Sequence, residues 1–253
     1  VVDEIWAPTT FVRDAFIAGS DTPVTHIPVA VSIPPGIASD RAAFGIPDNV
    51  TAFLFAFDFS SFPARKNPEA VLAAYLRAFA ADRTAPVALI IKTRGRSPKK
   101  DEILADIRAM AATDPRIIVI DRLLDRLQMH RLTASVDVFV SLHRSEGFGL
   151  GLAEAMAMGK AAIATDFSGN RDFLTPATGF PVPWQPVPVG PDDYPFFIPG
   201  QVWAEPDIDA AAAIMRQLAA DPARIATVGA AARRYIEAVH SPAAVGHLIK
   251  ARL

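Results

Sequence analysis

The chain has 253 residues, about half of them hydrophobic, and a formal net charge of −2 at pH 7. This length allows one large α/β domain or two small ones, and the charge gives no electrostatic reason to expect a nucleic-acid partner. The absence of cysteine excludes disulfides and thiolate metal sites. No apolar run reaches the length of a membrane span, and we expect no signal peptide.

Predicted strands and helices alternate along most of the chain. Apolar, β-branched runs predict strands at 25–31, 51–57, 87–92, 116–120, 136–142 and 161–165. Helices are predicted at 68–81, 99–112, 121–134 and 149–158, the first capped by Asn67 and begun by Pro68. This alternation indicates an α/β fold with a Rossmann-like parallel sheet and helices on both faces. Ligands of such sheets bind at the carboxyl ends of the strands, so the loops there should converge on one crevice.

The segment 176–206 differs, because it contains nine prolines together with several aromatic residues. Disordered segments are poor in aromatics, so we expect an ordered loop. Helices are predicted to follow from 206 to about 220 and from 221 to about 240. Ser241-Pro242 then introduces a last short helix.

Residues 145–158 carry the most informative pattern, Ser-Glu-Gly-Phe-Gly-Leu-Gly-Leu-Ala-Glu-Ala-Met-Ala-Met. A predicted buried strand, a glycine-rich turn and a predicted helix form a geometry that binds phosphate through free backbone N–H groups and the helix dipole. Glu146 precedes the turn and Glu154 lies about two turns into the helix. Backbone atoms there could contact the phosphates of a ligand while the carboxylates contact its hydroxyls.

This stretch resembles the Glu-x7-Glu motif of retaining glycosyltransferases of family four, which have the GT-B fold. Residues 4–16, 57–68 and 165–173 resemble further segments of that family in the same order, so the resemblance covers nearly the whole chain. It implies the C-terminal half of a GT-B fold. Residues 1–22 would be the end of an absent N-terminal acceptor domain and a linker. Residues 23–241 would be the nucleotide-sugar-binding domain, and 242–253 a C-terminal helix.

The resemblance also implies roles for particular residues. Glu146 and Lys66 would be catalytic. Glu146 would contact the hydroxyls of the donor sugar and stabilise the positive charge that develops on it, and Lys66 would neutralise the diphosphate leaving group. Glu154 would accept hydrogen bonds from the ribose. The other implied donor-binding residues are Gly147, Phe148, Gly149, Leu150, Arg65, Gly169 and Asn170.

Simpler structural roles remain open for several of these positions. Glu146 could interact only with the dipole at the N-terminus of the helix, the glycines could allow close helix–strand packing, and Asn170 could be a helix cap. Ser60 stands where the family usually has an arginine, and Arg65 and Arg94 are the candidates to replace its charge.

The implied activity is transfer of a sugar from a nucleoside diphosphate sugar to an acceptor hydroxyl with retention, without metal or other cofactor, as in polysaccharide biosynthesis. A carbohydrate or lipid-linked acceptor would be held by the N-terminal domain, so the isolated chain should be inactive. We expect a cytoplasmic protein, with peripheral membrane association through that domain left open. The alternatives are a nucleotide-sugar epimerase and a non-catalytic domain that binds a nucleotide or a partner protein.

Overall fold

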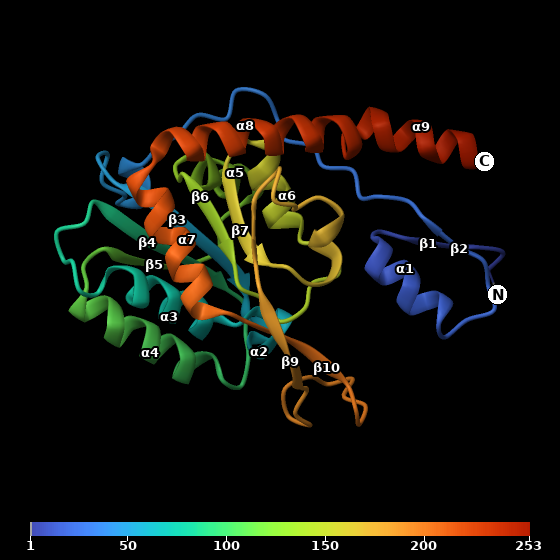
Figure 1. The fold of residues 1–253 in the computed structure, drawn as a ribbon, viewed down its shortest axis with the longest axis horizontal. Helices are drawn as coiled ribbons and strands as arrows, with labels where there is room; N and C mark the ends of the chain where they lie inside the picture. Colours follow the sequence, from blue (N-terminus) through green and yellow to red (C-terminus); the bar gives the residue numbers. More distant parts are fainter. Residues whose placement is uncertain (1) are drawn as a thin grey trace.

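A six-stranded parallel sheet forms the centre of the computed structural model, which describes residues 2–253. The strands run in the order β5-β4-β3-β6-β7-β8 (Figure 1). Every neighbouring pair is parallel. The bounds are β3 Thr51–Asp58, β4 Val87–Arg94, β5 Ile117–Asp121, β6 Val138–Ser141, β7 Ala161–Thr165 and β8 Phe180–Val182. The predicted fold class is therefore confirmed.

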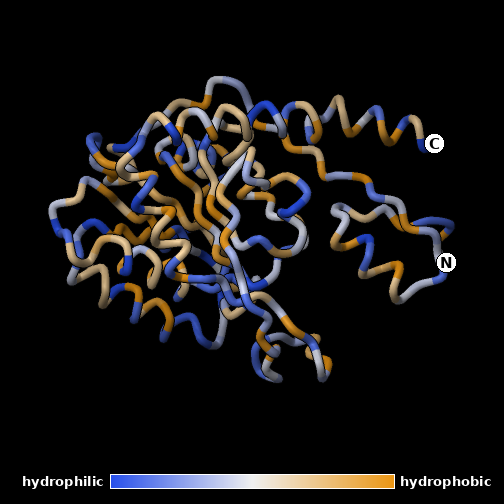
Figure 2. The backbone as a smooth tube through the Cα atoms, viewed as in Figure 1, coloured by the Kyte–Doolittle hydropathy of each residue, from blue (hydrophilic) through white to orange (hydrophobic). Residues whose placement is uncertain are grey.

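Two hydrophobic clusters, one on each face, attach the helices to this sheet. One face packs against α3 (Pro68–Phe79), α4 (Lys100–Thr113) and α7 (Ile208–Ala220). The other packs against α5 (Arg126–Ala134), α6 (Leu150–Ala157) and α8 (Pro222–Val239). Because both faces are covered, the strands are hydrophobic along their length, whereas the surrounding loops are more hydrophilic (Figure 2).

The strand order reverses between β3 and β6, the two central strands of the sheet. The connection after β3 leads away toward β4 on one side, and the connection after β6 leads toward β7 on the other. The two loops therefore diverge at the carboxyl ends of the strands, which is where doubly wound sheets bind ligands. The loop after β3 contains the 3-10 helix η2 (Phe59–Ser61) and the short helix α2 (Pro63–Lys66).

The predicted strand at 25–31 is wrong. Only Val24–His26 forms a strand, β2, and it pairs in parallel with β1 (Ile5–Ala7) outside the central sheet. With α1 (Thr10–Ile17) these strands form a β1–α1–β2 unit that lies beside the main body (Figure 1). The predicted domain boundary between residues 22 and 23 falls inside this unit. A 3-10 helix, η1 (Ala42–Phe44), precedes the central sheet.

One predicted helix start and one predicted helix cap also need correction. Helix α5 begins at Arg126 rather than 121, because Asp125 and Gln128 form a capping box. Pro68 does begin α3, but Asn67 does not cap it with its side chain. The Asn67 backbone instead adopts a left-handed conformation with φ 56°.

The proline-rich segment is ordered, as predicted, but much of it forms strands. After β8, strands β9 (Trp184–Pro188) and β10 (Val202–Pro206) make an antiparallel hairpin that projects from the body (Figure 1). The last helix, α9 (Pro242–Arg252), continues in line with α8, and an Arg252–Glu4 ion pair of 2.8 Å joins it to the β1–α1–β2 unit. Across residues 2–253, the structure contains no helix of sufficient length and hydrophobicity to cross a membrane.

Lys92 is an exception within the otherwise apolar strand β4. Its side chain is 3% exposed, and Nζ donates a hydrogen bond of 2.7 Å to the carbonyl of Thr93. Burial lowers the pKa of Lys92 to about 8. Since the unfolded chain binds this proton more tightly, the charged lysine destabilises the fold below pH 8, and this penalty shrinks as the pH rises toward 10.5.

We therefore predict that Lys92→Met raises the free energy of unfolding at pH 7 by up to about 3 kcal/mol. The advantage of the variant over the wild type should decline between pH 8 and pH 10.5. Urea unfolding at several pH values measures both effects, with the exposed Lys99→Met as the control. A difference between Lys92→Met and wild type that does not change with pH would contradict this account.

Candidate functional site

The loops after β3 and β6 are joined where the sheet order reverses. Arg144, after β6, donates from its backbone N to the carbonyl of Arg65 at 2.9 Å and from Nη1 to the carbonyl of Ala64 at 2.8 Å. Helix α2 is also flanked by two non-glycine residues with positive φ, Phe62 and Asn67. Such strained conformations persist only where surrounding contacts fix them, and they concentrate at functional sites.

This arrangement brings two cations to Glu146. Lys66 Nζ forms an ion pair with Oε2 of Glu146, and Arg65 Nη1 lies 3.4 Å from Oε1. Arg65 also donates to the carbonyl of Ser145 at 2.8 Å. Burial would raise the pKa of Glu146, but the charges of Lys66 and Arg65 outweigh it and hold that pKa below its usual value. Glu146 is thus an ionised carboxylate at neutral pH, not a proton donor.

The glycine turn after Glu146 presents backbone rather than side chains. Gly149, at the N-cap of α6, has φ 93° and no side chain to cap the first turn of the helix. The Phe148 ring is buried against Phe173 and His240, whereas Leu150 is half exposed. An uncapped helix start with free N–H groups is an anion-binding arrangement.

Glu154 lies further along α6, and its carboxylate faces α5. Oε1 is 3.5 Å from Nε2 of His130 and 3.8 Å from Nη2 of Arg126. The Glu154 side chain is 21% exposed, so it retains access to a ligand on this side of the sheet. The two glutamates of the sequence motif therefore lie on one strand–turn–helix unit, one at its turn and one on its helix.

Gly169 and Asn170 lie in the loop after β7, next to Glu146, and their polar groups form hydrogen bonds within the protein. The Gly169 N–H donates to the Glu146 carbonyl at 2.9 Å, and a Cβ at Gly169 would come within 2.1 Å of the Gly147 oxygen. Asn170 is fully buried, 3.0 Å from Nε2 of His143, and donates to the Thr165 carbonyl at 2.9 Å. The structure thus shows these residues supporting the turn. A contact between them and a ligand stays a prediction.

His143, for which the sequence indicated no particular role, is part of this support. It is 1% exposed, and burial lowers its pKa, so the ring is neutral at pH 7. Nδ1 lies 2.9 Å from Oγ of Ser141, which completes its contacts. A neutral, fully bonded histidine packs the loops together.

The structure distinguishes the two candidates for the charge missing at Ser60. Arg94 is half exposed and pairs with Asp58 at 2.8 Å. Arg65 instead lies beside Lys66 at Glu146. Ser60 itself accepts a hydrogen bond of 3.3 Å from the Arg96 backbone. Of the two arginines, Arg65 is the one that adds positive charge next to Lys66.

Sequence analysis missed the contacts that the β1–α1–β2 unit makes with this site. Thr9 Oγ1 donates to the Gly147 carbonyl at 2.9 Å, and the Thr10 N–H donates to Asp172 at 2.8 Å. His26 Nε2 lies 3.5 Å from the same carboxylate. Thr9 is recognisable in the sequence as an N-cap residue, but its second partner is 138 positions away and no local pattern indicates it.

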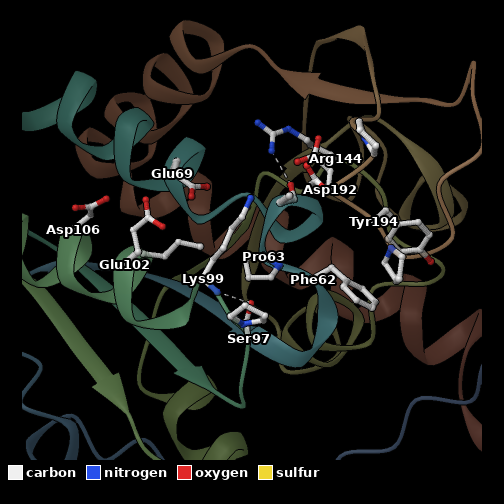
Figure 3. Close-up of a pocket in the computed structure, with 16 residues that line it drawn as sticks. Phe62, Pro63, Glu69, Ser97, Lys99, Glu102, Asp106, Arg144, Asp192 and Tyr194 are labelled. Carbon is white, nitrogen blue, oxygen red and sulfur yellow. Dashed lines mark hydrogen bonds between the residues drawn. The ribbon is translucent and has the colours of Figure 1, made fainter.

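A separate cavity of about 690 Å³ has Pro63 and Ala64, at the start of α2, in its wall. Its wall includes Phe62 and Tyr194, which stand together, and Arg144, which lies near Asp192; Glu69, Glu102 and Asp106 lie on the opposite side (Figure 3). Neither Glu146 nor Lys66 lines it. Within residues 2–253, no group of three or more His, Asp or Glu side chains is placed to hold a metal ion.

Solved structures share the fold of this chain at low sequence identity. Sucrose-phosphate synthase from Thermosynechococcus elongatus matches with a TM-score of 0.72 and 19% identity, over 100% of this chain and 58% of that one. Anabaena Alr3699/HepE, in complex with UDP and glucose, matches with a TM-score of 0.75 and 17% identity, over 99% and 63%. WaaG, a glycosyltransferase involved in lipopolysaccharide biosynthesis, matches with a TM-score of 0.69 and 16% identity, over 97% and 61%.

The chain thus spans about three-fifths of the length of these structures. Among proteins with curated functions, none matches its sequence. The family model for group 1 glycosyl transferases matches residues 51–187, more than half of the chain. That match includes the loop after β3, the glycine turn and both glutamates. The chain therefore belongs to the group 1 glycosyl transferases and has the fold of the C-terminal domain of a GT-B glycosyltransferase.

Proposed function

We propose that this chain is the donor-binding domain of a retaining glycosyltransferase, which transfers a sugar from a nucleoside diphosphate sugar to an acceptor hydroxyl. The observation that carries the proposal is the arrangement at the carboxyl ends of β3 and β6. Two cations, Arg65 and Lys66, pair with Glu146, and the uncapped start of α6 lies between Glu146 and Glu154 on one strand–turn–helix unit. Cations and free N–H groups suit a diphosphate, and carboxylates suit hydroxyls.

In this proposal the diphosphate lies at the N-terminus of α6, contacted by the backbone of residues 147–150 and by Lys66. The ribose lies toward Glu154 and the sugar toward Glu146. Gly169 and Asn170 would support the glycine turn through hydrogen bonds within the protein. Similar structures contain UDP together with a sugar, including glucose in HepE and GlcNAc in the pneumococcal O-GlcNAc transferase GtfA, so UDP is the first nucleotide to test.

Lys66 and Arg65 would stabilise the negative charge of the departing diphosphate, as a metal ion does in other transferases. Glu146, as an ionised carboxylate, would stabilise positive charge on the sugar as the glycosidic bond breaks. Retention follows if the acceptor hydroxyl attacks the sugar from the same face from which the diphosphate leaves. The proton of that hydroxyl would pass to an oxygen of the departing phosphate. The anomeric configuration of the product, determined by NMR, tests retention.

The acceptor would be a carbohydrate or lipid-linked molecule bound mainly by an N-terminal domain. A donor site alone cannot orient a second substrate, so we expect the 253-residue chain to bind the donor without transferring the sugar.

We predict that a nucleoside diphosphate raises the melting temperature of this chain. Binding to the folded state stabilises it by an amount that grows with the ratio of ligand to Kd. A thermal-shift panel of UDP, GDP, ADP and CDP, each also tested with its sugar conjugates, identifies the base, and calorimetry gives the affinity. No binding of any member at millimolar concentration would refute the donor site and favour a protein-binding domain.

We predict that Lys66→Ala weakens diphosphate binding far more than nucleoside binding. A charge-assisted contact to phosphate contributes about 1.5–3 kcal/mol, so the nucleoside diphosphate should lose roughly 10- to 150-fold in affinity. Calorimetry with the nucleoside and its diphosphate measures both. Lys99→Ala, an exposed lysine on another loop, is the matched control. Equal losses for the two ligands would remove Lys66 from the phosphate site.

Substitutions of the two glutamates should have different effects in the same assay. Glu154→Ala should weaken bare nucleoside diphosphate by about tenfold, because ribose hydrogen bonds to a charged acceptor are lost. Glu146→Gln should not weaken it, and should tighten it a few fold, because Lys66 and Arg65 no longer share their charge with a carboxylate. Glu237→Gln, on the exposed face of α8, is the control.

In a protein that contains both domains, Glu146→Gln should reduce kcat more than donor affinity, since its contact strengthens as charge develops on the sugar. The assignment of the two glutamates is reversed if Glu146→Gln abolishes nucleotide binding while Glu154→Ala has no effect.

A further inference from the structure

His130 is a buried histidine with no hydrogen-bond partner on either ring nitrogen. It lies on α5, its side chain is 3% exposed, and both Nδ1 and Nε2 are without a bond. Buried polar atoms are normally satisfied, so an exception of this kind needs a structural or functional explanation. The nearest charged group is the carboxylate of Glu154, whose Oε1 lies 3.5 Å from Nε2.

That distance is slightly longer than a good hydrogen bond, which runs to about 3.2 Å. A small movement of the Glu154 side chain would therefore bond its Oε1 to Nε2 of His130. The other side chain near Glu154, Arg126, is a weaker anchor. Its side chain is 71% exposed, lies 3.8 Å from Oε1, and donates at 3.3 Å to the Ser32 carbonyl.

Orientation of this carboxylate matters for its proposed role. To accept hydrogen bonds from two adjacent hydroxyls, a carboxylate must present its oxygens in one particular plane. A free glutamate on a helix samples several rotamers, and fixing one on binding costs side-chain entropy. A donor that holds Oε1 from the protein side removes part of this cost and leaves the outward lone pairs for the ligand.

We propose that His130 is a positioning residue for Glu154, donating a hydrogen bond from Nε2 to Oε1 when a ribose is bound. The inference rests on the proposed function, because it assumes that Glu154 binds the ribose. His130 does not touch the ligand itself. It determines how strongly the site distinguishes a ribonucleotide from its deoxy analogue.

The test compares UDP with 2′-deoxy-UDP and 3′-deoxy-UDP by calorimetry, or the equivalent set for the base that binds tightest. His130→Gln keeps an N–H at the position of Nε2, whereas His130→Met has similar reach and no donor. Glu154→Gln and the Glu154→Gln/His130→Met double variant complete a cycle. Melting temperatures of all variants report effects on folding.

The wild type should prefer the ribonucleotide by about tenfold or more, the effect of losing a charge-assisted hydrogen bond. His130→Met should reduce that preference at least threefold, and His130→Gln should largely keep it. The double variant should be no worse than Glu154→Gln alone. If His130→Met fails to fold, His130→Asn replaces it: its shorter amide cannot reach Oε1, so the preference should fall.

Two results would overturn the proposal, and they differ in meaning. If Glu154→Gln lowers the preference but His130→Met weakens all three ligands equally, His130 is only a packing residue and the ribose site stands. If Glu154→Gln leaves the preference unchanged, the assignment of Glu154 to the ribose is itself wrong.

Discussion

Close backbone packing between the turn after β6 and the loop after β7 is the constraint on which the candidate site depends. Both backbone groups of Glu146 are bonded to the loop after β7: its N–H donates to Ser168 Oγ at 2.8 Å, and its carbonyl accepts from Gly169. Gly169 lies so close to Gly147 that no side chain fits between them. Ser168 adopts a positive φ to make this contact. The backbone of Glu146 is thereby fixed on both sides, while its carboxylate pairs with Lys66 and Arg65.

The same turn explains why a carboxylate and two cations coexist at a partly buried site. Each charge alone would be costly to bury, and the cost is partly offset because Glu146 pairs with both Lys66 and Arg65. Glu146 pairs with the same cations that we assign to the diphosphate. In the proposed complex, the diphosphate would replace one anion with another, without a large rearrangement of the protein. This exchange would also free the Glu146 carboxylate to turn toward the sugar.

The sequence predicted those parts of the fold that depend on local patterns. Buried parallel strands are continuous hydrophobic runs, so β3, β4 and β7 were located almost to the residue. The failures have identifiable causes. The run at 25–31 is apolar because Val29 and Val31 pack against the core cluster on one face of the sheet, not because it is a strand of that sheet. Asn67 matches a capping residue, yet its backbone is turned into the left-handed region by the α2 bend. No local pattern reports such a bend.

The site shows the same division. The spacing of Glu146 and Glu154 along one strand, turn and helix was readable, because all of it lies within one short segment. The partners of these residues were not readable: His130 comes from another helix, and Asn170 and His143 are brought together by packing across 27 positions. The family motif therefore marks the residues that we assign to the ligand, while the groups packed around them become visible only in three dimensions.

Thr9 performs two tasks with one hydroxyl group. Its oxygen accepts from the Val12 N–H at 3.2 Å, which starts α1, and the same hydroxyl donates to the Gly147 carbonyl at 2.9 Å, in the glycine turn. A rigid-body movement of the β1–α1–β2 unit would therefore pull directly on the backbone next to Glu146. Through this one side chain, the start of α1 is bonded directly to the glycine turn, so a displacement of either element would move the other.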